Sequence, residues 1–290
     1  MKIAVVGASG ELGRRVLGCL AHAGVTDLVA TTRAPDHFYL PAPDEGQRPT
    51  IRQLDLTDVS KAVQTLKDCD RVIFTPILTL SEPVATALRE AGSKAGVIMV
   101  SSNNAGIDYS SPVYEDIRAS EERVSKLSGD WAIVRPTMLY GAPDDGNIGR
   151  LTQIAMTRPV LPMPGSGKAL HQPIHYSDMA ELLAMLAVRQ SLPQMKVSAF
   201  GSEVLTLNEM YRHILEQTGS KAMVLRPPLW ALKSLTTLFG KIGPISKDQL
   251  KRAELDRVPT WPAMVDWDAK TSFAQGVAGI ADAIRTGAGK

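Results

Sequence analysis

The sequence predicts an α/β protein: a doubly wound parallel sheet followed by a smaller C-terminal lobe. Short apolar runs alternate with helical patterns up to about residue 140, a glycine-rich turn follows the first run, and the alternation then loosens. Consecutive parallel strands need crossover helices, which cover both faces of the sheet. We therefore expect one domain over residues 1–140, rejoined by 172–201, and a smaller lobe over most of 141–290.

The strands of this sheet are predicted from short runs rich in β-branched and apolar residues, as is typical of strands buried on both faces. The first six runs are KIAVVG (2–7), DLVATT (27–32), IRQLDL (51–56), RVIFTP (71–76), GVIMVSS (96–102) and WAIVRP (131–136). KVSAFG (196–201) is predicted to be a seventh strand.

The helices follow from apolar residues that recur with a period of about 3.6. Asp58 and Ser81 are expected at helix N-termini, and Gly24 and Gly129 at C-termini. The predicted helices cover 10–24, 58–69, 81–95, 111–129, 175–190, 206–219 and 228–244.

The composition excludes several classes of protein. Apolar residues make up 44% and charged residues 21%, and the net charge of +2 is too small to indicate nucleic acid as a partner. No stretch approaches the ~20 apolar residues that span a bilayer, and the N-terminus does not resemble a signal peptide. The two cysteines, Cys19 and Cys69, lack metal-ligand spacing, and Cys19 is predicted to be a buried thiol. We expect a cytoplasmic protein, and its oligomeric state, including a homo-oligomer, stays open.

The segment VVGASGELG places glycines at 7, 10 and 13, directly after the first strand and at the start of the first helix. Gly7 suits a tight turn, Gly10 lets the backbone approach a pyrophosphate at the helix N-terminus, and Gly13 allows close packing of the helix. This context predicts a dinucleotide site in a Rossmann-type domain, although a purely structural glycine turn remains the alternative.

The cofactor preference is predicted from the end of the second strand. An NAD-selective site places an acidic residue there to bind the ribose 2′-hydroxyl, but this chain has Arg33. An arginine suits a 2′-phosphate, and Arg14 and Arg15 could assist it. We therefore predict NADP (NADPH), with solvated surface arginines as the alternative.

With these motifs, the sequence resembles the short-chain dehydrogenase/reductase superfamily over nearly its whole length. It is most similar to the extended and atypical branches, which include epimerase/dehydratase-like, NmrA-like and complex I accessory-subunit-like proteins. The resemblance is carried by the segments GASGELG, LDLTD, MVSSNN, YEDIRASEERV with Glu122, VRPTMLYG and HQPIHYSDMA.

The resemblance implies a set of cofactor-binding residues at the ends of the predicted strands. Asp55 and Leu56 would contact the adenine, and the segment VRPTMLYG would lie near the nicotinamide. The full set is Gly7, Ser9, Gly10, Glu11, Leu12, Gly13, Arg33, Asp55, Leu56, Thr75, Pro76, Ser101, Arg118, Pro136 and Thr137.

The resemblance also implies a catalytic set, Tyr114, Arg118 and Ser102, in which the chain departs from the family, and one register puts Asn103 in the place of Ser102. The family pairs its tyrosine with a lysine four residues later, where this chain has Arg118. Positions i and i+4 share a helix face, and a tyrosine, with an ordinary pKa of ~10, needs a nearby cation to act near neutrality. Tyr114 could donate a proton, support the cofactor, or lie on the helix surface.

The predicted function is an NADP(H)-dependent oxidoreductase that acts on a small carbonyl or alcohol. The alternatives are a non-catalytic NADPH-binding sensor or assembly protein, and an epimerase or dehydratase that recycles its bound cofactor. His171 and His175 are separated by a proline and predict no metal site. Loops near 76–81, 103–113 and 141–171 are expected to set the specificity for a small-molecule substrate, which the sequence does not name.

Overall fold

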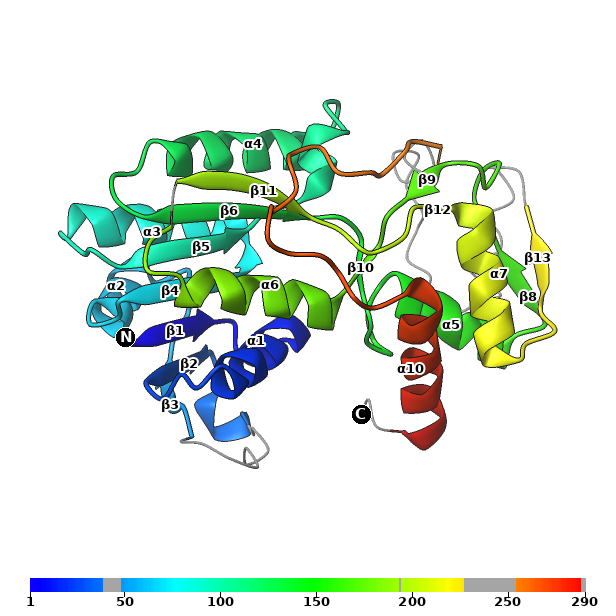
Figure 1. Ribbon diagram of the computed structural model, residues 1–290, viewed down its shortest axis with the longest axis horizontal. Coiled ribbons are helices and arrows are strands. Elements are labelled where there is room, and N and C mark those ends of the chain that lie inside the picture. The colour runs from blue at the N-terminus through cyan, green and yellow to red at the C-terminus, as the bar shows by residue number, and fades with distance from the viewer. Residues whose placement is uncertain (39–47, 193, 227–253, 288–290) are drawn as a thin grey trace. The chain divides into compact units, whose positions relative to one another are not determined.

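The computed structural model describes residues 1–38, 48–192, 194–226 and 254–287, so the helix predicted over 228–244 lies entirely outside the described residues (Figure 1). The chain forms two compact units. The first unit comprises Met1–Pro136, Tyr176–Ala199 and Thr260–Trp267; the second comprises Thr137–His175, Phe200–Pro259 and Asp268–Lys290.

The first unit contains a seven-stranded sheet in the order β11-β6-β5-β4-β1-β2-β3, and every neighbouring pair is parallel. All seven predicted strands are confirmed. The central strands bury their apolar side chains, which explains why both faces need cover, whereas the edge strand β3 is largely exposed. The bounds are β1 (Ile3–Val6), β2 (Leu28–Thr32), β3 (Thr50–Gln53), β4 (Arg71–Ile77), β5 (Gly96–Val100), β6 (Trp131–Pro136) and β11 (Met195–Ala199).

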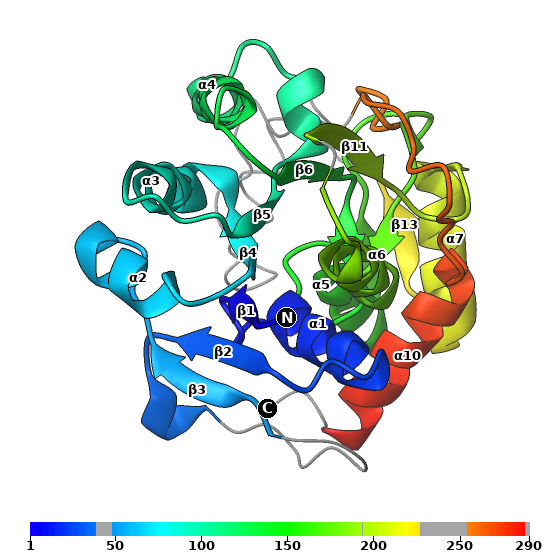
Figure 2. The same cartoon turned by 60° about the vertical axis from the view of Figure 1, so that its left-hand side comes forward.

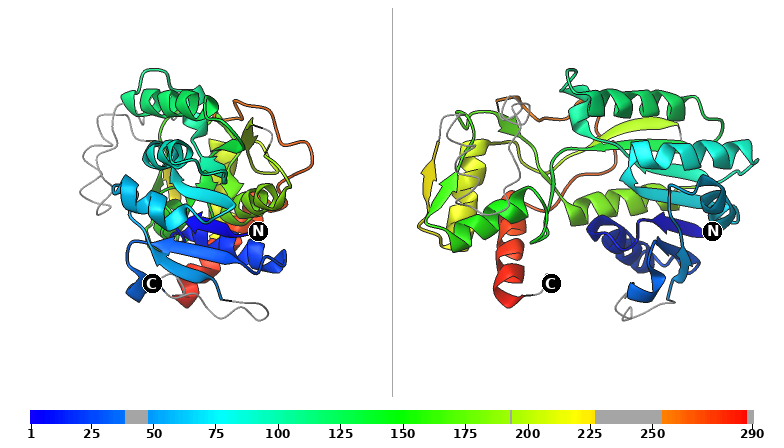
Figure 3. Two further views of the ribbon diagram at one scale, coloured as in Figure 1. Left: turned by 90° about the vertical axis from the view of Figure 1, so that its left-hand side faces the viewer. Right: turned by 180° about the vertical axis from the view of Figure 1, so that it is seen from behind.

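Helices cover both faces of this sheet, as Figures 2 and 3 show. On one face, three helices and the strands share a core cluster that includes Phe74, Leu88 and Ile133. On the other face, α1 packs along α6. The helices of the first face are α2 (Val59–Leu66), α3 (Leu78–Glu90) and α4 (Pro112–Ser125), and those of the second are α1 (Glu11–His22) and α6 (Tyr176–Val188).

Local sequence signals explain where α1 and α2 lie. The apolar stripe of α1 is buried as predicted, with Val16 and Leu20 fully enclosed. The Asp58 side chain accepts a hydrogen bond from the Lys61 backbone N–H at 3.0 Å and caps α2, which confirms the predicted N-cap. Cys19 departs from the prediction because it is only half-buried.

Two predicted helix ends are wrong. The third helix begins at Leu78, so Ser81 lies within its first turns, where the Ser81 hydroxyl donates to the Pro76 carbonyl at 3.2 Å instead of capping the helix. A serine in that position can satisfy a backbone acceptor of the preceding turn. The fourth helix ends at Ser125, and Gly129, with φ +76°, belongs to the turn that follows.

The sheet reverses its strand order between β1 and β4. In open α/β sheets, ligands bind at the carboxyl ends of the strands at such a switch point. The carboxyl half of β4 is also irregular, because its pairing with β5 shifts between Phe74 and Ile77. A local bulge of this kind re-aims side chains next to functional sites.

The second unit has its own core around Tyr140, Met210 and Phe273. Helix α7 is confirmed and begins with a capping box of Thr206 and Glu209. The sequence prediction missed α10, although Ser272 and Gln275 form a second capping box at its start. The elements are α5 (Ile148–Thr157), α7 (Leu207–Thr218), α10 (Phe273–Thr286) and the short pairs β7 (Leu139–Tyr140) with β10 (Ile174–His175), β9 (Leu170–His171) with β12 (Leu205–Thr206), and β8 (Val160–Pro162) with β13 (Met223–Leu225). Among the described helices, none is long and apolar enough to cross a bilayer.

Candidate cofactor and proton-transfer site

The turn between β1 and α1 requires glycine at two of its three glycine positions. Gly7 has φ +79°, and a Cβ there would lie 2.7 Å from the Thr75 hydroxyl. That hydroxyl donates to the Val6 carbonyl at 2.8 Å, so β4 holds the turn directly. A Cβ on Gly13 would lie 2.3 Å from the Gly7 carbonyl oxygen, which explains the close packing of α1 on the turn.

Gly10 differs from its two neighbours in the motif. It is exposed, and a Cβ there would meet only the Gly7 carbonyl, at 3.4 Å. Its φ of −76° is accessible to any residue. The fold therefore does not require glycine at position 10, and the missing side chain keeps the approach to the N-terminus of α1 open.

The N-terminus of α1 has the character of an anion site. Gly10 supplies no side-chain cap, so the first N–H groups of the helix face outward with the positive end of the helix dipole. Glu11 is turned to Arg15, whose Nε donates to the carboxylate at 2.7 Å, and Arg15 also donates to the Ser177 hydroxyl at 2.7 Å. Arg15 is thus held within the protein, whereas Arg14 is exposed.

At the end of β2, Arg33 is exposed, and its side chain forms no hydrogen bond or ion pair with the residues that the structure describes. Its backbone carbonyl accepts a hydrogen bond from Gln53 at 3.1 Å, which fixes the chain at this point. Asp55 accepts from the Thr57 N–H and hydroxyl at 2.9 and 2.8 Å; these bonds, with a smaller contribution from Arg33, lower the pKa of the Asp55 carboxyl. Leu56 is half-buried against the core.

A buried ionic network lies behind the end of β5. The Ser101 hydroxyl donates to Glu121 at 2.5 Å, and Arg135 binds both carboxylate oxygens of Glu121, at 2.8 and 2.6 Å. The Arg135 and Glu121 side chains are only 6% and 4% exposed. Ser101, a predicted cofactor-binding residue, therefore directs its hydroxyl into this network.

The same network holds the segment that returns at residues 260–267. Arg135 donates to the Thr260 hydroxyl at 3.0 Å and its guanidinium lies 3.6 Å from the ring centroid of Trp261. The Thr260 N–H and hydroxyl both donate to the Asn103 side-chain oxygen, at 3.0 and 2.9 Å. The loop after β5 is thus tied to the distal part of the chain.

Sequence reasoning missed Glu121 and Arg135 and placed its emphasis on Glu122; it considered Asn103 only as the alternative to Ser102. Glu122 is exposed and pairs with Lys196 at 3.5 Å. A usable signal was present: Glu121 falls on the buried face of α4 together with Ile117, and Arg135 interrupts an otherwise apolar strand. Opposite charges at two buried positions indicate a pair.

None of the hydrogen bonds shown among the described residues joins the Tyr114 side chain to the Arg118 side chain. The Tyr114 hydroxyl oxygen accepts a hydrogen bond from the Asn104 amide at 3.0 Å. Arg118 donates from Nη1 to the carbonyls of Ala105 and Asp108, at 2.9 and 3.3 Å. The predicted pair is therefore joined through the loop that follows β5.

The other predicted site residues lie on the glycine turn, at the start of α1, or at the carboxyl ends of β4, β5 and β6. Ser102 is half-buried and directly follows Ser101; Pro136 ends β6. The Thr137 hydroxyl, in the second unit, donates to the Gln172 carbonyl. Ser9, Leu12, Thr75 and Pro76 lie on the glycine turn, the start of α1 and the irregular end of β4.

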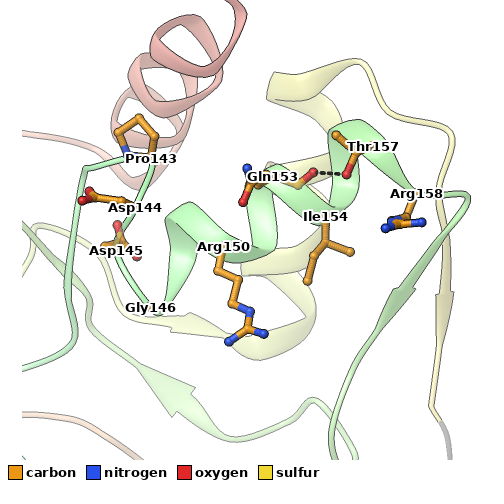
Figure 4. Close-up of a pocket in the computed structure, with 9 residues that line it drawn as sticks. All are labelled: Pro143, Asp144, Asp145, Gly146, Arg150, Gln153, Ile154, Thr157 and Arg158. Atoms are coloured by element: carbon orange, nitrogen blue, oxygen red, sulfur yellow. Dashed lines mark hydrogen bonds between the residues drawn. The ribbon is translucent and has the colours of Figure 1, made fainter. Parts of the chain in front are cut away.

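The second unit contains a cavity of about 740 Å³ beside α5, within the segment predicted to carry specificity (Figure 4). Asp145 anchors its rim, because the carboxylate accepts N–H bonds from the backbone of Gly141, Ala142, Asn147 and Gly149 at 2.8–3.2 Å. The lining consists of Pro143, Asp144, Asp145, Gly146, Arg150, Gln153, Ile154, Thr157 and Arg158.

The two histidines of the HQPIH segment, His171 and His175, have separate environments. His171, in β9, is 2% exposed, and neither ring nitrogen has a hydrogen-bond partner among the described residues. Burial, helped by the charge of Arg257, lowers the pKa of His171 to about 4. His175 packs edge-on against the Tyr140 ring at 5.3 Å. In the described part of the chain, no three His, Cys, Asp or Glu side chains gather as metal ligands.

A glycine turn at the switch point of a seven-stranded parallel sheet, with a second unit built from later segments, defines the extended short-chain dehydrogenase/reductase fold. The chain belongs to the NAD(P)H-binding family, whose pattern matches residues 7–159.

Comparison with characterised proteins agrees with this assignment. A ceramide reductase of Caulobacter vibrioides is 28% identical over 245 residues, which cover 78% of this chain and 73% of the relative. An NADPH-dependent quinone oxidoreductase of Escherichia coli superposes with a TM-score of 0.74 at 18% identity, covering 95% and 98% of the two chains. A dTDP-glucose 4,6-dehydratase of Bacillus anthracis, in complex with NAD, gives 0.73 at 12% identity, covering 99% and 97%. At these identities, the structural likeness is one of fold.

Proposed function

We propose that this protein is an NADP(H)-dependent oxidoreductase that reduces a carbonyl group or oxidises the corresponding alcohol. The observation that carries the proposal is the placement of the Tyr114 hydroxyl by Asn104, immediately beyond β5, in the same unit as the open glycine turn after β1. A dinucleotide site and a proton donor along one edge of a sheet are what carbonyl reduction requires.

The phosphorylated cofactor is supported by Arg33. Its exposed guanidinium, at the end of β2, is suited to a charge-assisted bond with a ribose 2′-phosphate. The pyrophosphate would lie over Gly10 and accept hydrogen bonds from the N-terminus of α1. The quinone oxidoreductase of similar fold is described as NADPH-dependent, which is consistent with this choice.

In the proposed reaction, a nicotinamide held at this site would supply the hydride for the carbonyl carbon. Tyr114 donates its phenol proton to the carbonyl oxygen, so that hydride and proton together yield the alcohol. The Ser102 hydroxyl, half-buried beyond β5, donates a hydrogen bond to the same oxygen and orients it. Water then returns a proton to Tyr114.

The substrate class is supported by the relative named a ceramide reductase, and we propose a carbonyl on an apolar molecule. The test is NADPH oxidation, followed by absorbance, with a panel of small ketones, quinones and ceramide-type lipid ketones. Turnover of at least one member is expected. Tight NADPH binding without turnover of any member would contradict the oxidoreductase proposal.

The proton-donor assignment makes a separate prediction. Tyr114→Phe keeps the ring and removes the hydroxyl, so turnover should fall by ~10²–10⁴ while NADPH affinity stays unchanged. Tyr109→Phe is the matched control, because Tyr109 lies on the loop that precedes α4, is 72% exposed, and would keep the ring that Arg118 contacts. Native turnover by Tyr114→Phe would show that the proton comes from Ser102, from water or from the substrate itself.

A non-catalytic NADPH sensor is the second candidate, and the environment of Arg118 favours it. The family's cation at this position serves the catalytic tyrosine, whereas Arg118 is engaged with the carbonyls of Ala105 and Asp108. Stoichiometric cofactor that survives purification and is not oxidised by any substrate would support this candidate, or an epimerase or dehydratase that recycles its cofactor. Multiple turnovers of added NADPH would exclude both.

A further inference from the structure

The Asn104 amide fixes how the Tyr114 hydroxyl can be used. Asn104 lies in the 3₁₀ turn η2 (Asn103–Gly106), and its Nδ2 donates to the phenol oxygen at 3.0 Å. An N–H donor must approach a lone pair of that oxygen, so the phenol proton points away from Asn104. The contact therefore sets both the position of the oxygen and the direction of its proton.

Arg118 holds the turn that carries Asn104. Its Nη1 donates to the carbonyls of Ala105 and Asp108, at 2.9 and 3.3 Å, and its guanidinium lies 4.7 Å from the ring centroid of Tyr109. A lysine ammonium could donate to a carbonyl, but it lacks the planar group with which arginine stacks on an aromatic ring. This arrangement gives a physical reason for arginine at position 118.

The residues on either side of Asn104 are held as well. Asn103 accepts two hydrogen bonds from Thr260, and the Asp108 carboxylate accepts from the Ser110 N–H and hydroxyl at 3.1 and 2.8 Å. A side chain on a loop that is held at several points keeps one geometry, as a proton-transfer site requires.

We propose that Asn104 is the positioning residue for the Tyr114 proton, and that Arg118 acts on Tyr114 through the η2 turn instead of through the cofactor. The inference rests on the proposed function in that Tyr114 is taken as the proton donor. It predicts that Asn104→Leu lowers kcat about tenfold, the effect of one lost hydrogen bond, with KM and NADPH affinity unchanged.

A double-mutant cycle separates this role from a structural one. In a Tyr114→Phe background, Asn104→Leu should lower kcat no further, because the group that it positions is already absent. An additional tenfold loss would overturn the proposal. Gln194→Leu is the matched control, since it removes an amide hydrogen bond of 3.1 Å, to the Gly129 carbonyl, at the opposite edge of the sheet.

The role of Arg118 is tested by its conservative replacement. Arg118→Lys introduces the cation usual in the family, so it should preserve or raise kcat if Arg118 serves the cofactor and Tyr114 directly. If Arg118 holds the turn, Arg118→Lys should lower kcat about as far as Asn104→Leu does, and the two changes together should give little more than either alone. Full activity of Arg118→Lys would show that Arg118 does not act by holding the η2 turn.

A spectroscopic measurement tests the contact without turnover, so its failure is distinguishable from failure of the proposed function. With ¹³Cζ-labelled tyrosine, the Tyr114 resonance is the one that Tyr114→Phe removes. It should shift in Asn104→Leu and Arg118→Lys but not in Gln194→Leu. An unmoved resonance would overturn the positioning role, while a shifted resonance in a protein that turns over no carbonyl would refute only the oxidoreductase proposal.

Discussion

The glycine turn between β1 and α1 is shaped mainly by contacts within its own motif, with one bond from the Thr75 hydroxyl, whereas the loop after β5 is held by residues far along the chain. Gly13 packs on the Gly7 carbonyl, six positions back. Asn103, by contrast, is bonded by Thr260, at a separation of 157 residues. The comparison teaches that the cofactor half of this site is a local motif, and the proton-transfer half is a product of tertiary packing.

The largest expected effect concerns NADPH binding at the glycine turn, the half of the site that forms a local motif. Gly10→Val should abolish NADPH binding, because its side chain would stand where a pyrophosphate must approach, while the melting temperature stays near native. Gly13→Val should lower the melting temperature instead, since its Cβ would clash with the Gly7 carbonyl. Gly18→Val is the control on the same helix, where a Cβ meets nothing within 4 Å. Undiminished NADPH binding by Gly10→Val would reduce the motif to a structural turn.

The next effect concerns stability at the proton-transfer half of the site, which depends on contacts between residues far apart in sequence. Glu121→Ala leaves Arg135 as an unpaired buried charge, which should cost about 3–5 kcal/mol of unfolding free energy. Glu122→Ala, at the neighbouring and exposed position, should cost at most about 1 kcal/mol. Denaturant unfolding of both variants provides the measurement. Equal losses from the two changes would mean that the buried pair adds nothing specific to this edge of the sheet.

His171, in the second unit, is a group whose pKa depends on packing. Below pH 6.5 an unfolded chain binds a proton at His171 that the folded protein does not bind until about pH 4, so stability should fall as the pH drops through this window. The loss is at most about 3 kcal/mol. His171→Gln should flatten this part of the stability–pH curve, and the exposed His22→Gln should not. Parallel curves for native protein and His171→Gln would contradict the assignment.

The smallest expected effect concerns the preference for NADPH over NADH, which we assign to Arg33. NADPH should bind more tightly than NADH, and Arg33→Ala should narrow that difference by about 1.5–3 kcal/mol through loss of a charge-assisted bond. Lys61→Ala, an exposed change on α2, controls for the loss of one positive charge. Fluorescence titration of both cofactors gives the values. Equal native affinities for NADPH and NADH would remove the case for a 2′-phosphate site.

The comparison also shows why parts of the site were predictable and others were not. The three glycines are recognisable because their spacing after a strand reflects a local requirement for close approach. Tyr114 and Arg118 were predicted as a pair from their i, i+4 spacing. Both side chains instead form hydrogen bonds with the loop after β5, and the spacing carries no information about where that loop lies. Ser101 was predicted beside the cofactor, yet its hydroxyl faces Glu121, because a buried carboxylate needs donors wherever the fold supplies them.

The sequence by itself determined the seven parallel strands, the crossover helices that its periodicity marked and the dinucleotide turn, since each follows from the period of apolar residues or from the steric demands of single glycines. Only the tertiary structure decided which polar side chains meet. Glu121 lies on the same helix as Tyr114, but its partners Ser101 and Arg135 come from the end of β5 and from β6. Such contacts arise when separate segments must satisfy one another's buried charges and hydrogen bonds, and no local pattern along the chain specifies that pairing.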